Sequence, residues 1–218
     1  MARVAFSLVK GILIDLGGVL IDNDWRAAAR ARGARLRVPE SSFLAALFEG
    51  SDDQVLVGRV SEPAWWERVR DRLQIEVDVL DELRADLAAR ERWEDDLVAL
   101  LRQVRGATRI AIVSNAWPGT RARIVAAGVA DIADEIVISA EVGCAKPDAR
   151  IFQVALESLA LRPHDALFID DTARHVDAAA ALGMLGHVHR DPGSTAAAIA
   201  RFVATGNQVH GPSNAGGA

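Results

Sequence analysis

The sequence predicts an α/β fold in which helices surround a parallel sheet and a helical segment is inserted after the first strand. From about Leu20 to Arg105 the apolar residues have helix-like spacing, with almost no run typical of a buried strand. From Arg109 onward, short apolar runs alternate with helix-like stretches, the pattern of a parallel sheet covered by helices. We therefore expect a core from residues 1–20 and 106–205, a helical insert from 21–105, and a flexible tail from 206–218.

The first strand is expected over Gly11 to Ile14, a short apolar run that ends at Asp15 and a glycine turn. In the insert, Ser61 precedes an early proline, a combination that starts helices, and a stripe of apolar residues follows at helical spacing. That stripe contains Trp66, Val69 and Leu73. A second stripe contains Leu97, Leu100, Leu101 and Val104, and Gly106 ends it.

The rest of the core follows the same alternation. Each predicted strand is a short apolar run, and each predicted helix lies between two such runs. The strands are expected at 110–113, 135–138, 166–169 and 186–189, and the helices near 119–127, 149–159, 173–182 and 195–204.

Composition and net charge bear on the class of partner. The chain has 218 residues, a net charge of -5, half of its residues apolar and a quarter charged, which is typical of a soluble globular protein. This balance favours neither nucleic acid nor an anionic membrane as partner. The apolar stretch after Arg3 superficially resembles a signal peptide, but Lys10 and Asp15 interrupt it. Cys144 is the one cysteine, so the chain cannot form an internal disulfide, and we expect a cytoplasmic protein. We expect it to be a monomer or a homodimer.

Polar side chains follow the predicted strands at their carboxyl ends. Asp15 follows the first strand, Ser114 and Asn115 follow the second, and Asp170 and Asp171 follow a later one. Open α/β sheets place their chemistry at this edge. A separate turn, Lys146-Pro147-Asp148, adds one ammonium group. The sequence therefore predicts that these separated segments meet in one site.

The residue types in this site suit phosphoryl transfer. A carboxylate such as Asp15 can act as a covalent nucleophile, provided that other groups neutralise the charge on the phosphate. Asp170 and Asp171 offer the hard oxygen ligands that Mg²⁺ prefers, and Asp15 could complete the set. Lys146 would bind phosphate as a point charge, and the hydroxyl of Ser114 could donate to an anion.

The motifs resemble those of the haloacid dehalogenase superfamily of hydrolases, in the subgroup with a helical cap inserted between the first two motifs. Their order and spacing are more specific than any single motif. The resemblance rests on Asp15-Leu-Gly-Gly-Val-Leu, Ile-Val-Ser114-Asn115, Gly143-Cys-Ala-Lys146-Pro147-Asp148 and Phe168-Ile-Asp170-Asp171, with weaker support from Gly58-Arg59-Val60-Ser61 and Trp65-Trp66. It implies a Rossmann-like three-layer core with a parallel sheet and a small all-helical cap.

The resemblance also implies a role for each motif residue. Asp15 would be the nucleophile, and its carboxylate would bind Mg²⁺ together with the backbone carbonyl of Gly17. Asp171 would be a direct metal ligand, with Asp170 acting through water or Lys146. The phosphoryl group would be held by Gly18, Ser114, Asn115 and Lys146. The implied activity is a Mg²⁺-dependent phosphatase of a small, sugar-phosphate-like metabolite that forms an aspartyl-phosphate.

One position departs from the family pattern. Phosphatases that this chain resembles usually carry a second Asp two residues after the nucleophile, as acid and base, and here that residue is Gly17. General acid-base catalysis contributes roughly 10²- to 10⁴-fold in rate, so turnover could be slow. Asp22 or Asp24 could substitute. Two alternatives stay open, namely a dehalogenase and a non-catalytic phosphate-binding protein.

Two further residues allow alternative interpretations. Trp117, three positions after Ser114, could contact substrate at the mouth of the site or pack against the cap. His175 is expected to be a partly exposed histidine on a helix and not a catalytic base.

Overall fold

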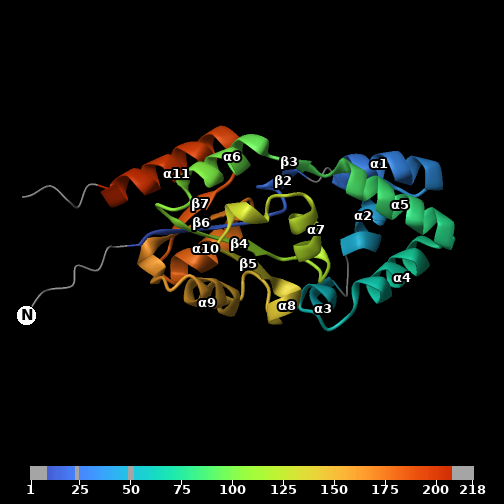
Figure 1. Ribbon diagram of the computed structural model, residues 1–218. Coiled ribbons are helices and arrows are strands. Elements are labelled where there is room, and N and C mark those ends of the chain that lie inside the picture. The colour runs from blue at the N-terminus through green and yellow to red at the C-terminus, as the bar shows by residue number, and fades with distance from the viewer. Residues whose placement is uncertain (1–8, 23–24, 49–51, 208–218) are drawn as a thin grey trace, which may run out of the picture.

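The centre of the molecule is a five-stranded parallel sheet (Figure 1). The computed structural model describes residues 9–22, 25–48 and 52–207. The strands are β1 (Gly11–Ile14), β4 (Arg109–Ser114), β5 (Glu135–Ile138), β6 (Ala166–Asp170) and β7 (Leu185–Val188), in the spatial order β5-β4-β1-β6-β7. All four pairings are parallel, which confirms the predicted α/β class.

Helices cover both faces of the sheet and form a three-layer core. Alternate residues of β1 belong to different hydrophobic clusters, with Ile12 and Ile14 on one face and Leu13 on the other. The first face is covered by α6 (Asp95–Val104), α7 (Thr120–Ala126) and α11 (Pro192–Asn207), and the second by α9 (Ala149–Ser158) and α10 (Ala173–Ala181). Three short elements complete the core, namely η1 (Ala130–Ile132), α8 (Ser139–Val142) and η2 (Pro163–Asp165).

The helical insert lies beside the sheet and has a hydrophobic cluster of its own (Figure 1). It consists of α1 (Trp25–Leu36), α2 (Glu40–Phe48), α3 (Asp52–Leu56), α4 (Glu62–Leu73) and α5 (Val77–Arg90). Phe43 and Trp65 are fully buried at its centre, and Ser61 caps α4 by accepting a hydrogen bond from the Ala64 amide, as its sequence predicts. A short antiparallel ribbon, β2 (Ile21–Asp22) with β3 (Arg92–Trp93), joins the insert to the core and was not predicted.

Helix α6 differs from its expected assignment. The sequence places residues 95–104 in the insert, but Leu97, Val98 and Leu101 belong to the hydrophobic cluster of the sheet, and α6 packs against α11. An amphipathic stripe shows that a helix buries one face, but not which of two cores that face covers. The exact division of the chain into core and insert stays a prediction.

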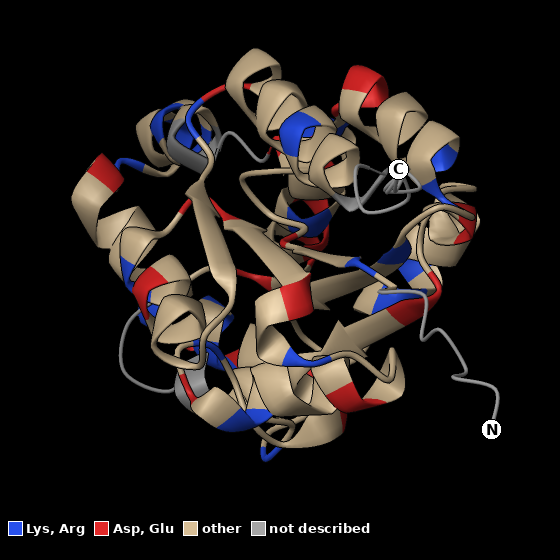
Figure 2. Ribbon diagram, turned by 90° about the vertical axis from the view of Figure 1, so that its left-hand side faces the viewer, with Lys and Arg blue, Asp and Glu red and all other residues tan. Residues whose placement is uncertain are grey.

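The other predicted core elements agree with the structure to within about a residue, except α11, which is longer than the predicted 195–204. Residues 4–8 of the signal-like stretch, which runs to Val9, lie outside the described residues, as do Asp24 and residues 208–218 of the predicted tail. Among the described helices, none is both long and apolar enough to span a membrane. Figure 2 shows acidic and basic residues interspersed over the outer helices.

Candidate active site

The register of the sheet brings the predicted polar residues to one edge. Ile14 of β1 pairs with Ile112 of β4 and with Ile169 of β6, so the carboxyl ends of these three strands lie side by side. Asp15, Ser114 and Asp170 are therefore close to one another, and all three side chains are buried. The sequence-based expectation that these segments meet is realised in the fold.

Lys146 lies between two carboxylates. Its Nζ atom is 2.7 Å from Oδ1 of Asp15 and 2.7 Å from Oδ2 of Asp170, and its side chain is inaccessible to solvent. Asn115 holds the backbone of Lys146 in place: its Oδ1 accepts from the Lys146 amide at 2.7 Å, and its Nδ2 donates to the Lys146 carbonyl at 2.8 Å. Because Asn115 directly follows β4, these two hydrogen bonds tie the loop that carries Lys146 to the sheet edge.

The two carboxylates differ in their electrostatic environment. Burial raises the pKa of Asp15, and the nearby charge of Asp170 raises it further, although Lys146 opposes both effects. Burial also disfavours the charge of Asp170, but hydrogen bonds from His175, Lys146 and the Thr172 amide together hold its pKa below the usual range. Asp170 is thus the more firmly ionised of the pair.

His175 is buried, so the expectation of a partly exposed helix histidine is wrong. Its Nδ1 atom lies 3.1 Å from both oxygens of Asp170, and the Thr172 amide donates to Asp170 Oδ1 at 2.8 Å. The cause is local: α10 begins three residues after Asp170, so its first turn folds back onto the carboxylate. Among the described atoms, Nε2 of His175 is buried without a hydrogen-bond partner.

Asp171 is exposed and lies against the glycine loop that follows β1. A Cβ atom on Gly18 would overlap Oδ2 of Asp171, and Gly18 has a φ of +78°. Only glycine adopts this conformation without strain and also leaves room for the carboxylate. Thr172 Oγ1 donates to Asp171 Oδ1 at 3.1 Å and orients it from the other side.

The acidic side chains could hold a divalent cation. Asp15, Asp170 and Asp171 each offer a carboxylate oxygen, and these oxygens all lie within 4.8 Å of one another. Carboxylate oxygen is the ligand type that Mg²⁺ prefers in proteins. The donor set therefore fits the metal that the sequence implies.

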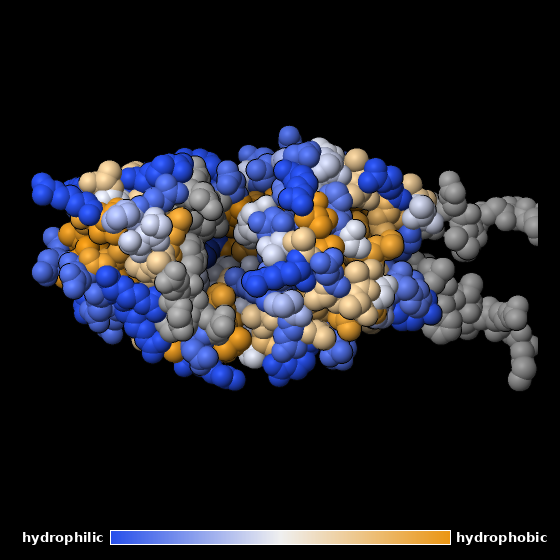
Figure 3. Space-filling view, turned by 180° about the vertical axis from the view of Figure 1, so that it is seen from behind, coloured by the Kyte–Doolittle hydropathy of each residue, from blue (hydrophilic) through white to orange (hydrophobic). Residues whose placement is uncertain are grey.

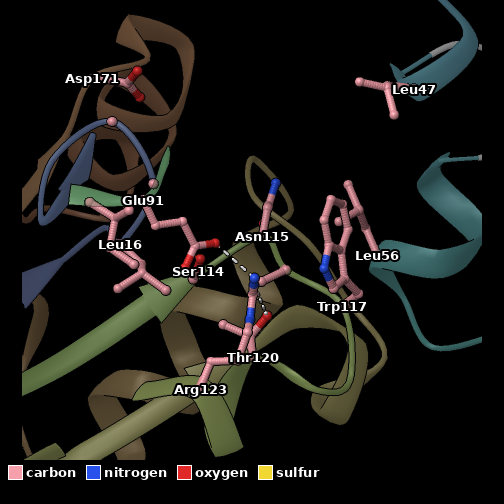
Figure 4. A pocket seen from close by; sticks show the side chains of 14 residues that line it. Leu16, Leu47, Leu56, Glu91, Ser114, Asn115, Trp117, Thr120, Arg123 and Asp171 are labelled. Atoms are coloured by element: carbon pink, nitrogen blue, oxygen red, sulfur yellow. Dashed lines mark hydrogen bonds and ion pairs between the residues drawn. The ribbon is translucent and has the colours of Figure 1, made fainter. Parts of the chain in front are cut away.

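A cavity of about 390 Å³ opens beside this cluster, between the core and the insert (Figures 3 and 4). Five of the predicted site residues line it, namely Gly17, Gly18, Ser114, Asn115 and Asp171. Leu47 of α2 and Leu56 of α3 approach from the insert on the opposite side (Figure 4). Substrate would thus be enclosed by both parts of the chain.

Trp117 packs against the insert, one of the two interpretations that the sequence left open, and its contact with substrate stays a prediction. It lines the cavity and also packs against Trp65 of α4, with 4.6 Å between the ring centroids.

Asp22, a candidate substitute acid, is exposed and lines a second cavity that shares Gly18 and Asp171 with the first.

Sequence reasoning missed three polar residues of the cavity: Glu91, Thr120 and Arg123. Glu91 directly follows α5, and the other two lie on α7. No sequence motif identifies these residues, because their position in the cavity wall depends on how the insert packs against the core. The only available signal was position: α7 starts soon after Ser114, so its first turns had to lie near the site.

Comparison with known proteins identifies the family of this chain. The family model of the haloacid dehalogenase-like hydrolases matches residues 9–183. The protein named phosphatase MT3486 of Mycobacterium tuberculosis is 26% identical over 201 residues, which cover 88% of this chain and 93% of that protein.

Solved structures share the fold, and two of them illustrate this. A HAD family enzyme of Bacteroides thetaiotaomicron, in complex with magnesium and inorganic phosphate, has a TM-score of 0.70 and 22% identity, and the match covers 86% of this chain and 98% of that one. The L-2-haloacid dehalogenase of Xanthobacter autotrophicus, with chloropropionic acid covalently bound, has a TM-score of 0.60 and 20% identity, covering 91% and 84% respectively.

Proposed function

Because the chain belongs to the haloacid dehalogenase-like hydrolase family, we propose that it is a Mg²⁺-dependent phosphatase of a small phosphorylated metabolite. The observation that carries this proposal is the cluster in which Lys146 bridges Asp15 and Asp170 while Asp171 lies beside the cavity. Displacement of halide from carbon requires no cation, whereas a phosphate ester brings negative charges that a metal and a lysine neutralise. The retained acidic pair therefore favours phosphate chemistry over dehalogenation.

Asp15 is the proposed nucleophile. Its Oδ1 atom accepts hydrogen bonds from the Leu16 amide and from Lys146, which leaves Oδ2 to attack phosphorus. The new O–P bond forms as the ester P–O bond breaks, and the leaving group departs as an alcohol after it gains a proton. Water then hydrolyses the aspartyl-phosphate, which releases phosphate and restores the Asp15 carboxylate.

The other residues hold the reacting groups. Ser114 lines the cavity and would donate its hydroxyl to a phosphoryl oxygen, together with the backbone at Gly18. Lys146 would balance charge on the nucleophile, and Asn115 would keep Lys146 in position through its two backbone hydrogen bonds. Asn115 thus acts on phosphate mainly through Lys146.

Asp15, Asp171 and the carbonyl of Gly17 would hold Mg²⁺, with Asp170 tied behind them to Lys146 and His175. When bound, the cation would neutralise the charge on the phosphoryl oxygens. Gly17 supplies no side-chain acid, so protonation of the leaving group falls to water or to another group. We therefore expect faster turnover of aryl phosphates, whose leaving groups need little protonation, than of alkyl phosphates.

The helical insert is the proposed cap. Leu47 and Leu56 contribute an apolar wall to the cavity, and a cap in this position would exclude bulk water from the reaction. The proposal also retains the cytoplasmic location that the sequence suggests.

The test is hydrolysis of an aryl phosphate with Mg²⁺ and with excess chelator. We expect turnover that requires Mg²⁺, and a loss of roughly 10³-fold or more in Asp15→Asn, because the amide is a poor nucleophile. Asp96→Asn, at an exposed position in the first turn of α6, is the matched control and should retain wild-type activity. Circular dichroism checks that each variant is folded.

Three results would contradict the proposal. Near-normal activity of Asp15→Asn would exclude the covalent route. Halide release from chloropropionate without Mg²⁺ would indicate a dehalogenase. Binding of inorganic phosphate without turnover of any phosphate ester would indicate a non-catalytic phosphate-binding protein.

A further inference from the structure

An ion pair crosses the cavity wall where the insert meets the core (Figure 4). Nη1 of Arg123, on α7, lies 2.8 Å from Oε1 of Glu91, the residue that directly follows α5. Nη2 of Arg123 donates to Oγ1 of Thr120 at 3.2 Å. The pair therefore has one member in the core and one at the return from the insert.

The charge of this cavity is set by few residues. Among the described residues that line it, Glu91, Arg123 and Asp171 carry charge, and Asp171 belongs to the proposed metal site. The remaining wall includes the apolar side chains of Leu16, Ile21, Leu47, Leu56 and Trp117. Away from the phosphate, the described part of the wall thus offers a substrate one balanced ion pair beside Thr120 in mainly apolar surroundings.

We propose that Glu91 and Arg123 select the leaving group of the substrate, and that their pairing favours an uncharged leaving group with hydroxyl groups. This inference rests on the proposed phosphatase function. A hydroxyl both donates and accepts, so it can bond to Glu91 and to Arg123 without breaking their ion pair. A carboxylate on the leaving group would be repelled by Glu91, and an ammonium would be repelled by Arg123.

The pair is accessible enough to meet a ligand. The Arg123 side chain is 47% exposed and that of Glu91 is 22% exposed, and both line the cavity. Arg121, two residues earlier on the same helix, forms an ion pair with Glu141 but is not among the residues that line the cavity. Arg121 therefore provides a control with the same residue type, helix and kind of partner.

The experiment compares kcat/KM for glycerol phosphate, phosphoglycerate and aminopropyl phosphate, which differ in the charge of the leaving group. The wild-type protein should prefer glycerol phosphate. Glu91→Gln leaves Arg123 without its ion-pair partner, so the ratio of phosphoglycerate to glycerol phosphate should rise on the order of tenfold. Arg123→Gln leaves Glu91 without its ion-pair partner, so the ratio of aminopropyl phosphate to glycerol phosphate should rise by a similar factor. The control variant Arg121→Gln should change neither ratio.

Ratios between substrates do not depend on the fraction of folded enzyme, so a partly unfolded variant still gives a valid result. The charge-swapped double variant, Glu91→Arg with Arg123→Glu, restores a pair and should return both ratios toward wild type. If the pair only fastened the insert to the core, all three substrates would lose activity equally and the ratios would stay constant. That result, or a wild-type preference for phosphoglycerate, would overturn the inference.

The two proposals fail in different ways. A wild-type protein that hydrolyses no phosphate ester, including the aryl phosphate, would refute the phosphatase function itself. If the protein hydrolyses phosphate esters but its kcat/KM ratios between substrates are unchanged in Glu91→Gln and Arg123→Gln, only the inference on these two residues is refuted.

Discussion

Gly18 is the residue on which the position of Asp171 depends most directly. Its φ is positive, and a Cβ atom at this position would overlap the Asp171 carboxylate, so there is no room for another side chain. We predict that Gly18→Ala weakens Mg²⁺ binding by about tenfold and lowers the free energy of unfolding by about 1 kcal/mol. Calorimetric titration with Mg²⁺ and urea denaturation measure the two effects.

Gly128→Ala is the control that separates the backbone strain of a positive φ from the overlap with Asp171. Gly128 has a φ of +70°, but its Cβ would meet nothing within 4 Å. This variant should show a similar loss of stability with unchanged Mg²⁺ binding. Equal Mg²⁺ affinity in both variants would mean that Asp171 does not contribute to a metal site.

His175 contributes to the site through Asp170. His175→Ala removes a hydrogen bond from a buried carboxylate, which leaves Lys146 and the Thr172 amide as its partners. We predict a decrease of about 1–3 kcal/mol in the free energy of unfolding, measured by urea denaturation. His164→Ala, at an exposed histidine, should stay within about 0.5 kcal/mol of wild type. A His175→Ala variant as stable as the control would show that the contact contributes nothing.

At the scale of elements, a carboxylate joins α1 to α5. Oδ2 of Asp86 accepts from Arg90 Nε at 3.0 Å on its own helix and from Arg32 Nε at 3.3 Å on α1. The hydrogen bond from Arg90 lowers the pKa of Asp86; burial opposes this, and the contact with Arg32 adds to the lowering. The pKa of Asp86 in the folded state lies below its unfolded value of about 3.9. The ionised carboxylate therefore contributes fully to the free energy of unfolding above that pH, and this contribution is lost as the pH falls further.

We therefore predict that Asp86→Asn is less stable than wild type by about 0.5–1 kcal/mol at neutral pH, and that the difference shrinks as the pH falls below the unfolded-state pKa of about 3.9. Urea denaturation at a series of pH values measures this difference. Asp81→Asn, at an exposed position on the same helix, should match wild type to within about 0.5 kcal/mol throughout. A difference for Asp86→Asn that is constant with pH would exclude the ionic origin.

Whether a segment forms a helix was easier to predict than where that helix packs. The stripe from Leu97 to Val104 predicts a helix, and α6 is that helix. That its buried face packs on the sheet could not be predicted, because periodicity identifies a buried face but carries no information about which core covers it. The ribbon of β2 and β3 was missed for a similar reason, since two-residue strands are defined by their pairing and have no pattern of their own.

At the scale of the whole molecule, contacts at Trp117 and at Gly58 hold the insert against the core, in addition to the ion pair of Glu91 with Arg123. Trp117 stacks on Trp65 across the boundary. Gly58 allows the loop after α3 to approach the backbone of Ala140, since a Cβ at Gly58 would overlap that carbonyl oxygen. The contact of Trp117 helps to set the width of the cavity, because Trp117 lines it opposite Leu47.

We predict that Trp117→Ala lowers the free energy of unfolding by about 1–3 kcal/mol and increases the radius of gyration measured by small-angle scattering. Trp117→Phe keeps an aromatic ring against Trp65 and should show a smaller change in both quantities. An unchanged radius of gyration in Trp117→Ala would show that other contacts alone hold the insert in place.

The order of residues along the chain was enough to predict the parallel sheet and the meeting of Asp15, Ser114, Lys146 and Asp170. Alternating apolar runs specify strands locally, and parallel strands necessarily bring their carboxyl ends to one edge. The three-dimensional packing was needed to reveal that His175 faces Asp170, that α6 covers the sheet, and that Glu91 meets Arg123 in the cavity. These contacts depend on how helices pack and how the insert sits on the core, and the local pattern of residues does not encode either.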